Sequence, residues 1–237
     1  IPTKIPGTHF TELLPMQAKI ADKFSIVRSM VNGAAGHPAG SMQMFSGDKA
    51  KRDKPKPSLP DWMSVANYLR AQESPRKNPL PRYMGIKPPT SYNGPAYLGD
   101  AYSPFAITGD PNAPKFTVPN VGLSDANESQ RVGRRVALRE RLDTLERAFD
   151  REGETGALDE FEQQALSLLT NPQARDAFDL SKESKRTRDR YGRNTWGQQL
   201  LLSRRLIESG VEIVTNQLNG PLCGRVNNWD DHAVNHH

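Results

Sequence analysis

The fold is decided by the stretch Trp196-Gly-Gln-Gln-Leu-Leu-Leu-Ser-Arg-Arg-Leu-Ile-Glu-Ser-Gly210, which leads directly into Val211-Glu-Ile-Val-Thr-Asn216. The leucines and Ile207 recur at helical spacing and alternate with charged residues, so the first part predicts an amphipathic helix capped by Thr195. Gly210 is the residue type that ends helices in a left-handed conformation. The β-branched residues after it predict a short buried strand. A helix, a tight turn and a strand in this order are typical of an α/β protein.

The predicted strand leads into a loop rich in Asp and His, Asn228-Trp229-Asp230-Asp231-His232-Ala-Val-Asn-His236-His237. Ligands of open α/β sheets bind beyond the carboxyl ends of the strands. Carboxylates and imidazoles are metal ligands, and alternate residues such as Asp230 and His232 can point the same way. We expect these two to bind a divalent metal, with Asp231 or His236 as a third ligand or an orienting partner. The alternative is that they cap the loop through hydrogen bonds.

A second candidate region lies near the start of the chain. Residues 24–30, Phe-Ser-Ile-Val-Arg-Ser-Met, predict a strand, and a glycine-rich loop containing His37 follows. The spacing of Gly33, Gly36 and Gly40 fits neither a phosphate-binding loop nor a dinucleotide fingerprint. His37 follows a strand as the Asp/His loop does, so it is a candidate anion or metal contact. The alternative is an ordinary surface histidine.

The middle of the chain divides by composition. Residues 48–125 are dense in proline and predict an irregular excursion, within which residues 82–86 are the only convincing strand. Asp61 predicts the N-cap of a helix that carries Trp62. Aromatic residues of this excursion either pack it against the body or line a substrate groove. They are Tyr92, Tyr97, Tyr102 and Phe105.

Residues 126–192 predict a helical insertion, because apolar residues keep helical spacing among dense Arg and Glu. Residues 193–237 form the unit of helix, strand and metal loop. We therefore expect one domain with a long proline-rich and helical insertion, and too few strands for a complete sheet.

Composition excludes several classes of protein. The chain has 237 residues, a net charge of +5 and one cysteine, Cys223, so it has no internal disulfide framework. No apolar run is long enough to span a membrane. The basic run at 49–56 lacks the interleaved aromatics or the module of a nucleic-acid binder, so we expect no nucleic-acid partner.

Several ordered motifs resemble one known family. They include Ile5-Pro-Gly-Thr-His9, Phe24-Ser-Ile-Val-Arg-Ser-Met30, Gly94-Pro-Ala-Tyr-Leu-Gly99-Asp-Ala-Tyr-Ser-Pro-Phe105, Phe178-Asp-Leu-Ser181, Arg190-Tyr-Gly192, residues 196–205 and Asn228-Trp-Asp-Asp-His232. Together they are similar to a bacterial sulfatase-like family of unknown function in the alkaline-phosphatase-like superfamily. The resemblance implies an incomplete α/β/α sandwich and identifies the chain as the central fragment of a longer protein. Further motifs would then precede Ile1 and follow His237.

The resemblance also implies a function. A parent protein of this family would be a periplasmic or secreted hydrolase of phosphate or sulfate esters, dependent on a divalent metal such as zinc. Trp229, Asp230 and His232 match its metal-binding motif, and His37 matches a histidine of its glycine-rich loop. The substrate would be a small anionic ester or a sulfated or phosphorylated glycan. The nucleophile would lie outside this chain, which favours Cys223 as a small loop residue over Cys223 as a nucleophile. The alternative is a non-catalytic surface protein that binds a glycan, because a basic loop and a long excursion could hold an acidic sugar.

Overall fold

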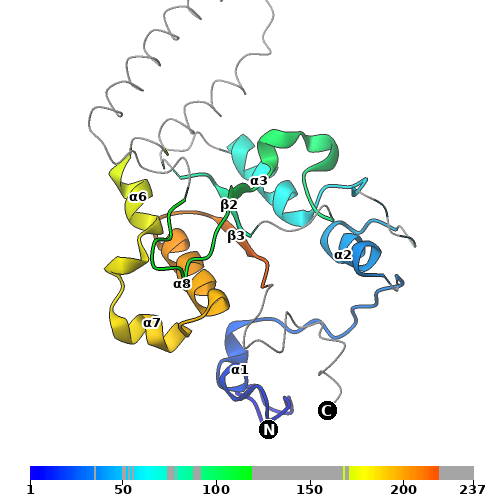
Figure 1. The fold of residues 1–237 in the computed structure, drawn as a ribbon. Helices are drawn as coiled ribbons and strands as arrows, with labels where there is room; N and C mark the ends of the chain where they lie inside the picture. The colour runs from blue at the N-terminus through cyan, green and yellow to red at the C-terminus, as the bar shows by residue number, and fades with distance from the viewer. Residues whose placement is uncertain are drawn as a thin grey trace, which may run out of the picture.

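The computed structural model describes residues 1–34, 36–49, 52, 54, 56–73, 78, 80–87, 92–118, 168 and 171–218. Among these residues, helices surround a small sheet, and the N-terminal segment with α1 extends away from this body (Figure 1). The elements follow one another as α1 (Pro15–Lys19), η1 (Ala21–Lys23), α2 (His37–Ser46), α3 (Trp62–Glu73), β1 (Tyr83–Ile86), η2 (Ala96–Leu98), η3 (Asp100–Tyr102), β2 (Phe105–Ile107), α6 (Pro172–Phe178), η4 (Leu180–Lys182), α7 (Lys185–Tyr191), α8 (Thr195–Glu208) and β3 (Ile213–Asn216).

The described sheet has three parallel strands in the order β2-β1-β3. β1 pairs with β3 from Tyr83 opposite Ile213 to Ile86 opposite Asn216. Parallel neighbours require long connections: η2 and η3 lie between β1 and β2, and the chain from β1 to β3 includes β2 and the helices α6, α7 and α8. The predicted α/β class is therefore confirmed. Three strands carry no feature specific to an alkaline-phosphatase-like sandwich.

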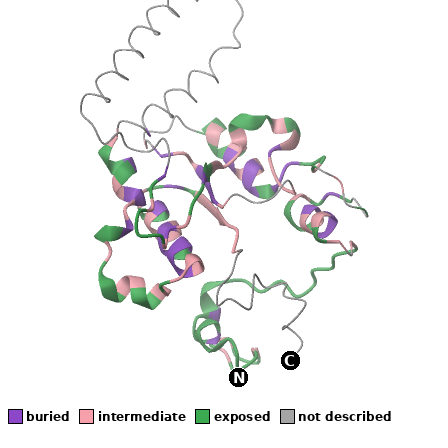
Figure 2. Ribbon diagram, viewed as in Figure 1, coloured by how far each residue is buried: buried purple, intermediate pink, exposed green. Residues whose placement is uncertain are grey.

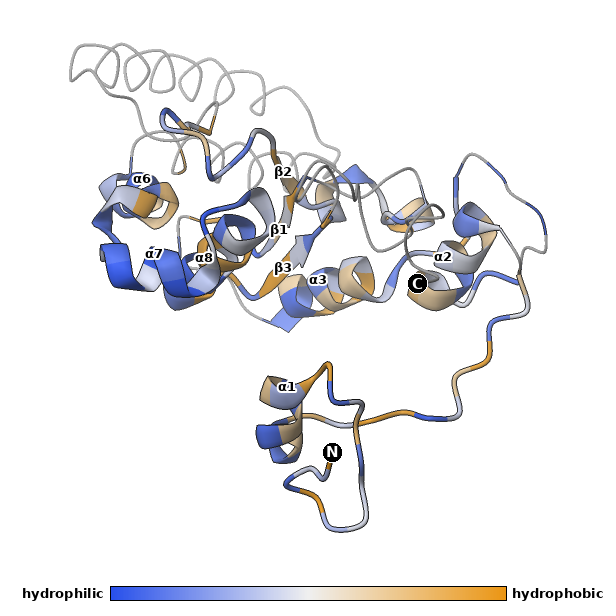
Figure 3. Ribbon diagram, turned by 60° about the horizontal axis from the view of Figure 1, so that its bottom comes forward, coloured by the Kyte–Doolittle hydropathy of each residue, from blue (hydrophilic) through white to orange (hydrophobic). Residues whose placement is uncertain are grey.

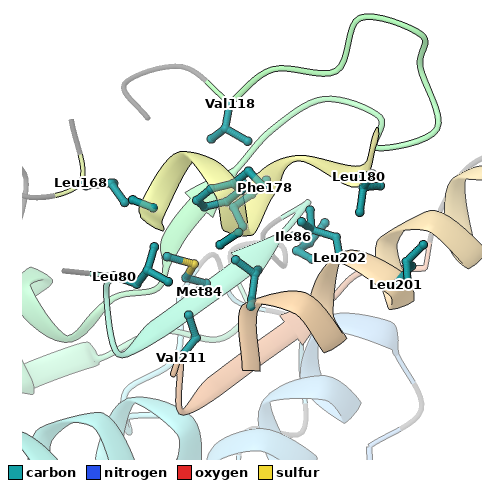
Figure 4. Packing of buried hydrophobic residues seen from close by; sticks show 14 residues of the cluster. Leu80, Met84, Ile86, Val118, Leu168, Phe178, Leu180, Leu201, Leu202 and Val211 are labelled. Carbon is teal, nitrogen blue, oxygen red and sulfur yellow. The ribbon is translucent and has the colours of Figure 1, made fainter. Parts of the chain in front are cut away.

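One face of β1 packs against α8 and α6. Met84 and Ile86 alternate with Tyr83 and Gly85, so they share one face of the strand, and both are fully buried. Figure 4 shows them facing Phe178 and Leu202 from the covering helices. The cluster comprises Leu80, Met84, Ile86, Ile107, Val118, Leu168, Ala174, Ala177, Phe178, Leu180, Leu201, Leu202, Leu206 and Val211.

The opposite face of β1 packs against α3. The Tyr83 hydroxyl donates to Met63 Sδ of α3 at 3.9 Å, and Tyr83 is 1% exposed. Burial raises the pKa of Tyr83 to about 12, partly opposed by the neighbouring Thr215 hydroxyl and reinforced by the Asp61 carboxylate. Helices thus cover both faces of the central strand, and Figure 2 shows burial concentrated along this strand and on the inner sides of α3 and α8.

Several local predictions are confirmed. Asp61 Oδ1 accepts a hydrogen bond from the Ser64 amide at 2.7 Å, as expected of the N-cap of α3. Gly210 has a φ of 93°, the left-handed stop predicted after α8. The cap at the other end of α8 is Asn194 and not Thr195, because Asn194 Oδ1 accepts the Gly197 amide at 2.8 Å.

One strand prediction is wrong, and one strand was missed. Residues 25–34 form no strand, and Val27, Met30 and Val31 are exposed. A strand requires hydrogen-bonded neighbours, and no described strand pairs with this stretch in spite of its β propensity. Conversely, β2 was not predicted, because three residues after Pro104 give too short a pattern. The first part of the predicted helical insertion lies outside the described residues, whereas α6 and α7 lie within its last part.

The aromatic residues of the excursion behave differently from one another. Tyr102 packs edge-on against Tyr68 of α3 at 5.0 Å between ring centroids. Phe105 begins β2 and packs against the core. Tyr97 is 73% exposed. Tyr102 and Phe105 therefore hold the excursion against the body, as predicted, and Tyr97 does not.

A carboxylate joins α8 to the elements before it. Glu183 Oε1 accepts hydrogen bonds from Arg204 Nη2 at 2.7 Å and from Arg205 Nη1 at 2.8 Å. Arg205 also donates to the carbonyls of Asp176 and Ala177 at the end of α6. Burial alone would raise the pKa of Glu183, but the hydrogen bonds from Arg205 and Arg204 outweigh it and hold the pKa below its ordinary value.

Glu183→Gln is expected to lower the free energy of unfolding at neutral pH by about 2 kcal/mol, the order of hydrogen bonds to charged groups. Because the folded pKa is depressed, the carboxylate contributes stability above the pKa of an unfolded Glu and loses it as the pH falls through the folded value. Urea titrations from neutral to acidic pH should therefore show the difference between the two proteins shrinking. Glu73→Gln, at an exposed ion pair, is the control. A difference independent of pH would contradict the assignment.

Gly197→Ala is expected to destabilise the protein by about 3 kcal/mol or more, because a Cβ there would overlap the backbone carbonyls of Tyr191 and Gly192. Gly33→Ala is the control, since a Cβ at Gly33 meets only the end of the Gln43 side chain, at 3.9 Å. Thermal unfolding of both variants measures the difference. Equal effects would show that the close approach of α8 to the 191–192 turn is not required.

Candidate functional site

The carboxyl edge of the sheet is the first region to consider, because ligands of parallel sheets bind there. β1, β2 and β3 end at Ile86, Ile107 and Asn216. Lys87, directly after the central strand, has a φ of 46°, in the left-handed region that side chains other than Gly seldom adopt. Its amide still donates to the Ile107 carbonyl at 2.9 Å. Such backbone strain is concentrated at functional sites in proteins.

Buried polar atoms lie beside the same edge. Asn216 Nδ2 donates to Ser203 Oγ at 2.6 Å, and Ser203 Oγ donates to the Gln199 carbonyl at 2.9 Å. Asn216 Oδ1 and both side-chain amide atoms of Gln199 are buried and have no hydrogen-bond partner among the described residues. Buried polar groups are normally paired. The end of β3 therefore lies in polar surroundings, although most of the sheet packs against apolar side chains.

The second region is a hollow of about 550 Å³ along one side of α2. Four residues of α2 line it, and their spacing of three and four residues places them on one face of the helix: His37, Ser41, Met44 and Phe45. Trp62, the first residue of α3, also lines it, as do Asn32, Ala34 and Gly36, which precede α2. Figure 3 shows α2 and α3 with apolar residues on both helices.

The loop beside α2 is held by side-chain hydrogen bonds. Asn32 Nδ2 donates to the Gly40 carbonyl at 2.9 Å, and Asn32 Oδ1 accepts the Ala34 amide at 2.9 Å. Gln43 Oε1 accepts the Gly33 amide at 3.0 Å. A Cβ on Gly40 would lie 3.1 Å from Asn32 Nδ2, so a glycine permits this close approach. The hollow is therefore largely preformed.

His37 is the only candidate residue from the sequence that the described part of the chain contains. It is exposed, begins α2 and lines the hollow. The predicted metal residues Asp230, Asp231, His232 and His236 lie outside the described residues, as does Cys223, so their arrangement stays a prediction. Among the described residues, no group of three or more His, Cys, Asp or Glu side chains could hold a metal.

The sequence did not single out Asn32, Trp62 or Asn216 for function. Trp62 was predicted to be a helix residue, and nothing in the local pattern shows that it is 61% exposed. The signal available for Asn32 was its place before a glycine-rich loop, where Asn side chains commonly bond nearby backbone. For Asn216 the signal was its place at the end of a predicted strand.

The fold and these two regions define a small parallel α/β protein with a polar strand edge and a separate preformed hollow. The chain belongs to the family described as "Protein of unknown function (DUF1501)", whose sequence model matches residues 1–237. Searches of curated proteins and of solved structures find no match.

This result corrects the family assignment made from the motifs. The matching family has no assigned activity, and nothing in the match links the chain to sulfatases. The description as a central fragment is also wrong, because one family model covers every residue of the chain. Some of the motifs, such as residues 94–105, are rich in Gly and Pro, and these residues meet turn requirements common to many α/β proteins. None of the described helices is both long and apolar enough to cross a membrane.

Asn32→Ala is expected to speed hydrogen exchange at the Ala34 amide, because that amide loses its acceptor. Asn32→Asp keeps the Oδ1 acceptor and should preserve this protection while it loses the bond to the Gly40 carbonyl. Exchange measured by NMR at Ala34, with the amides of α8 as internal control, tests the prediction. Unchanged protection at Ala34 in Asn32→Ala would show that Asn32 does not hold the loop.

Proposed function

We propose that the protein is a metal-dependent hydrolase of phosphate or sulfate esters, in which Asp230 and His232 hold a divalent cation, with zinc the first candidate. The observation that carries this proposal is the direction of β3. The strand ends at Asn216, at the carboxyl edge of a parallel sheet, and the Asp/His loop follows it in the sequence. That is where α/β proteins place their ligand-binding loops.

The chemistry of the donor residues fits a divalent cation. One carboxylate and one imidazole, with Asp231 or His236 as a further ligand or orienting partner, form the mixed oxygen and nitrogen set that zinc accepts. A bound cation would supply Lewis acidity and a water of lowered pKa. Helices on both faces of β1 are the layering expected if the sheet belongs to a larger α/β/α sandwich.

Residues of this chain would also favour an anionic substrate. The net charge is +5, and the basic run at 49–56 is the densest cluster of cations. His37 is the first residue of α2, the end of a helix that favours negative charge, and stays a candidate contact for the ester group. The predicted periplasmic or secreted location stays a prediction.

Metal content of the untagged protein tests the proposal. The expected result is stoichiometric zinc or another divalent metal by elemental analysis, with loss of the metal in Asp230→Ala and in His232→Ala. His9→Ala is the matched control, because His9 is an exposed histidine in the N-terminal segment. Hydrolysis of an aryl phosphate or an aryl sulfate should disappear in the two variants that lose the metal.

Two results would overturn the proposal. Metal retained at full stoichiometry in both Asp230→Ala and His232→Ala would show that the loop does not bind it. Wild-type protein saturated with metal but without turnover of either ester would remove the hydrolase assignment.

A further inference from the structure

We propose that two copies of this chain associate by exchanging a strand, in which residues 24–31 of each copy pair with the outer side of β3 in the other copy. The outer side of β3 is the side that faces away from β1. This inference concerns assembly, so it goes beyond the proposed hydrolase function and does not depend on it.

The N-terminal segment exposes an unusual amount of apolar surface. Among the described residues, ten of the eighteen exposed large hydrophobic side chains lie within residues 1–31, so they are concentrated there. Val27 is 64% exposed, Met30 57% and Val31 89%. Single exposed hydrophobic residues are ordinary, but a cluster of them marks an interaction surface. Figure 1 and Figure 3 show this segment outside the body of helices and sheet, which leaves these side chains in water.

The backbone of residues 24–31 lacks the hydrogen bonds of a strand. None of its amides or carbonyls bonds to the backbone of a described residue, and Phe24 already has an extended conformation, with φ −144° and ψ 158°. Apolar residues occupy both alternating sets of positions, with Phe24 and Ile26 in one set and Val27 and Val31 in the other. This pattern is typical of a strand in a parallel sheet that is covered on both faces, as β1 is here. The segment therefore has the sequence of a strand and lacks a neighbour.

The outer side of β3 offers the neighbour that this segment lacks. The Ile213 amide donates to the Arg82 carbonyl at 3.0 Å, on the side of β1. Successive residues of a strand direct their backbone groups to opposite sides, so Val214 and Asn216 direct theirs away from β1. No described backbone group bonds to them there, because β3 is the last strand of the described sheet. An unpaired strand edge of this kind is a template for another strand.

The arrangement favours a second copy as the source of the added strand. Residues 24–31 of the same copy lie between η1 and α2, and Figure 3 shows this stretch separated from the sheet. Each copy carries one unpaired segment and one unpaired strand edge, so two copies can satisfy each other reciprocally. Such an exchange closes with two-fold symmetry and leaves no edge for a third copy. We therefore expect a dimer and not a larger assembly.

The mass of the full chain in solution tests the proposal. Sedimentation and light scattering over a range of concentrations should show a dimer that dissociates on dilution. Val27→Lys should raise the dissociation constant of the dimer about tenfold or more, because it places a charge within the added strand. Val27→Pro should have a similar effect, because it removes a backbone amide without adding charge. Leu69→Lys is the matched control, since Leu69 is an exposed residue of α3 outside both pairing surfaces, and it should leave the dissociation constant unchanged.

Cross-linking separates exchange between copies from pairing within one copy. In a Cys223→Ser background, a Val27→Cys chain and a Gln217→Cys chain are mixed and treated with a short bismaleimide. The mixture should give a product of two chains, in higher yield than either variant gives alone. A chain with both substitutions that cross-links at the mass of one chain would overturn the proposal, because its own segment would then cover β3.

Two further results would overturn it. One is a chain that stays monomeric at every concentration, and the other is a dimer that both Val27 variants leave unchanged. Circular dichroism of the variants checks that each keeps its fold. Metal content and ester hydrolysis of the wild-type chain are measured separately, so the hydrolase assignment can fail while the dimer stands, and the reverse.

Discussion

The parallel pairing of β1 with β3 is the interaction on which the described fold depends. It joins Tyr83–Ile86 to Ile213–Asn216, and no local sequence signal can bring two segments so distant into register. Two side-chain hydrogen bonds stabilise the start of the pair. Arg82 Nη1 donates to Glu212 Oε1 at 2.6 Å, and Asn78 Nδ2 donates to the Ser209 carbonyl at 2.8 Å. Because α8 turns directly into β3, this pairing also positions the helix against the core.

Different helices pack against the two faces of β1. Met84 and Ile86 lie against α8 and α6, whereas Tyr83 lies against Met63 of α3. The contact with α3 also helps to position Trp62, the first residue of that helix, which lines the hollow beside α2. The cluster of Glu183 with Arg204 and Arg205 similarly ties α8 to the end of α6. The two candidate sites are thus supported by elements packed on the same short strand.

The two candidate sites have different physical characters. The carboxyl edge of the sheet combines a strained residue, Lys87, with the buried polar atoms of Asn216 and Gln199. The hollow combines exposed apolar surface with a rigid loop.

The confirmed sequence predictions are those that depend on residues close together in the chain. Asp61 as N-cap, Gly210 as left-handed stop and the strand at 82–86 follow from hydrogen bonds and backbone sterics within a few residues. The same reasoning failed for residues 24–30, because β propensity does not provide a neighbouring strand. It failed for the family as well, because short motifs rich in Gly and Pro recur wherever turns require them.

By itself, therefore, the sequence determined the α/β class, the main helix and strand of residues 195–216, and the residue types from which a metal loop could be built. Only the tertiary structure decided that β2 joins the sheet, that Phe24–Met30 does not, and that Trp62 meets His37 and Phe45 around one hollow. The physical reason is that caps, turns and helical periodicity depend on neighbours in sequence. Strand pairing, exposure and the lining of a site depend on residues that only the folded chain brings together.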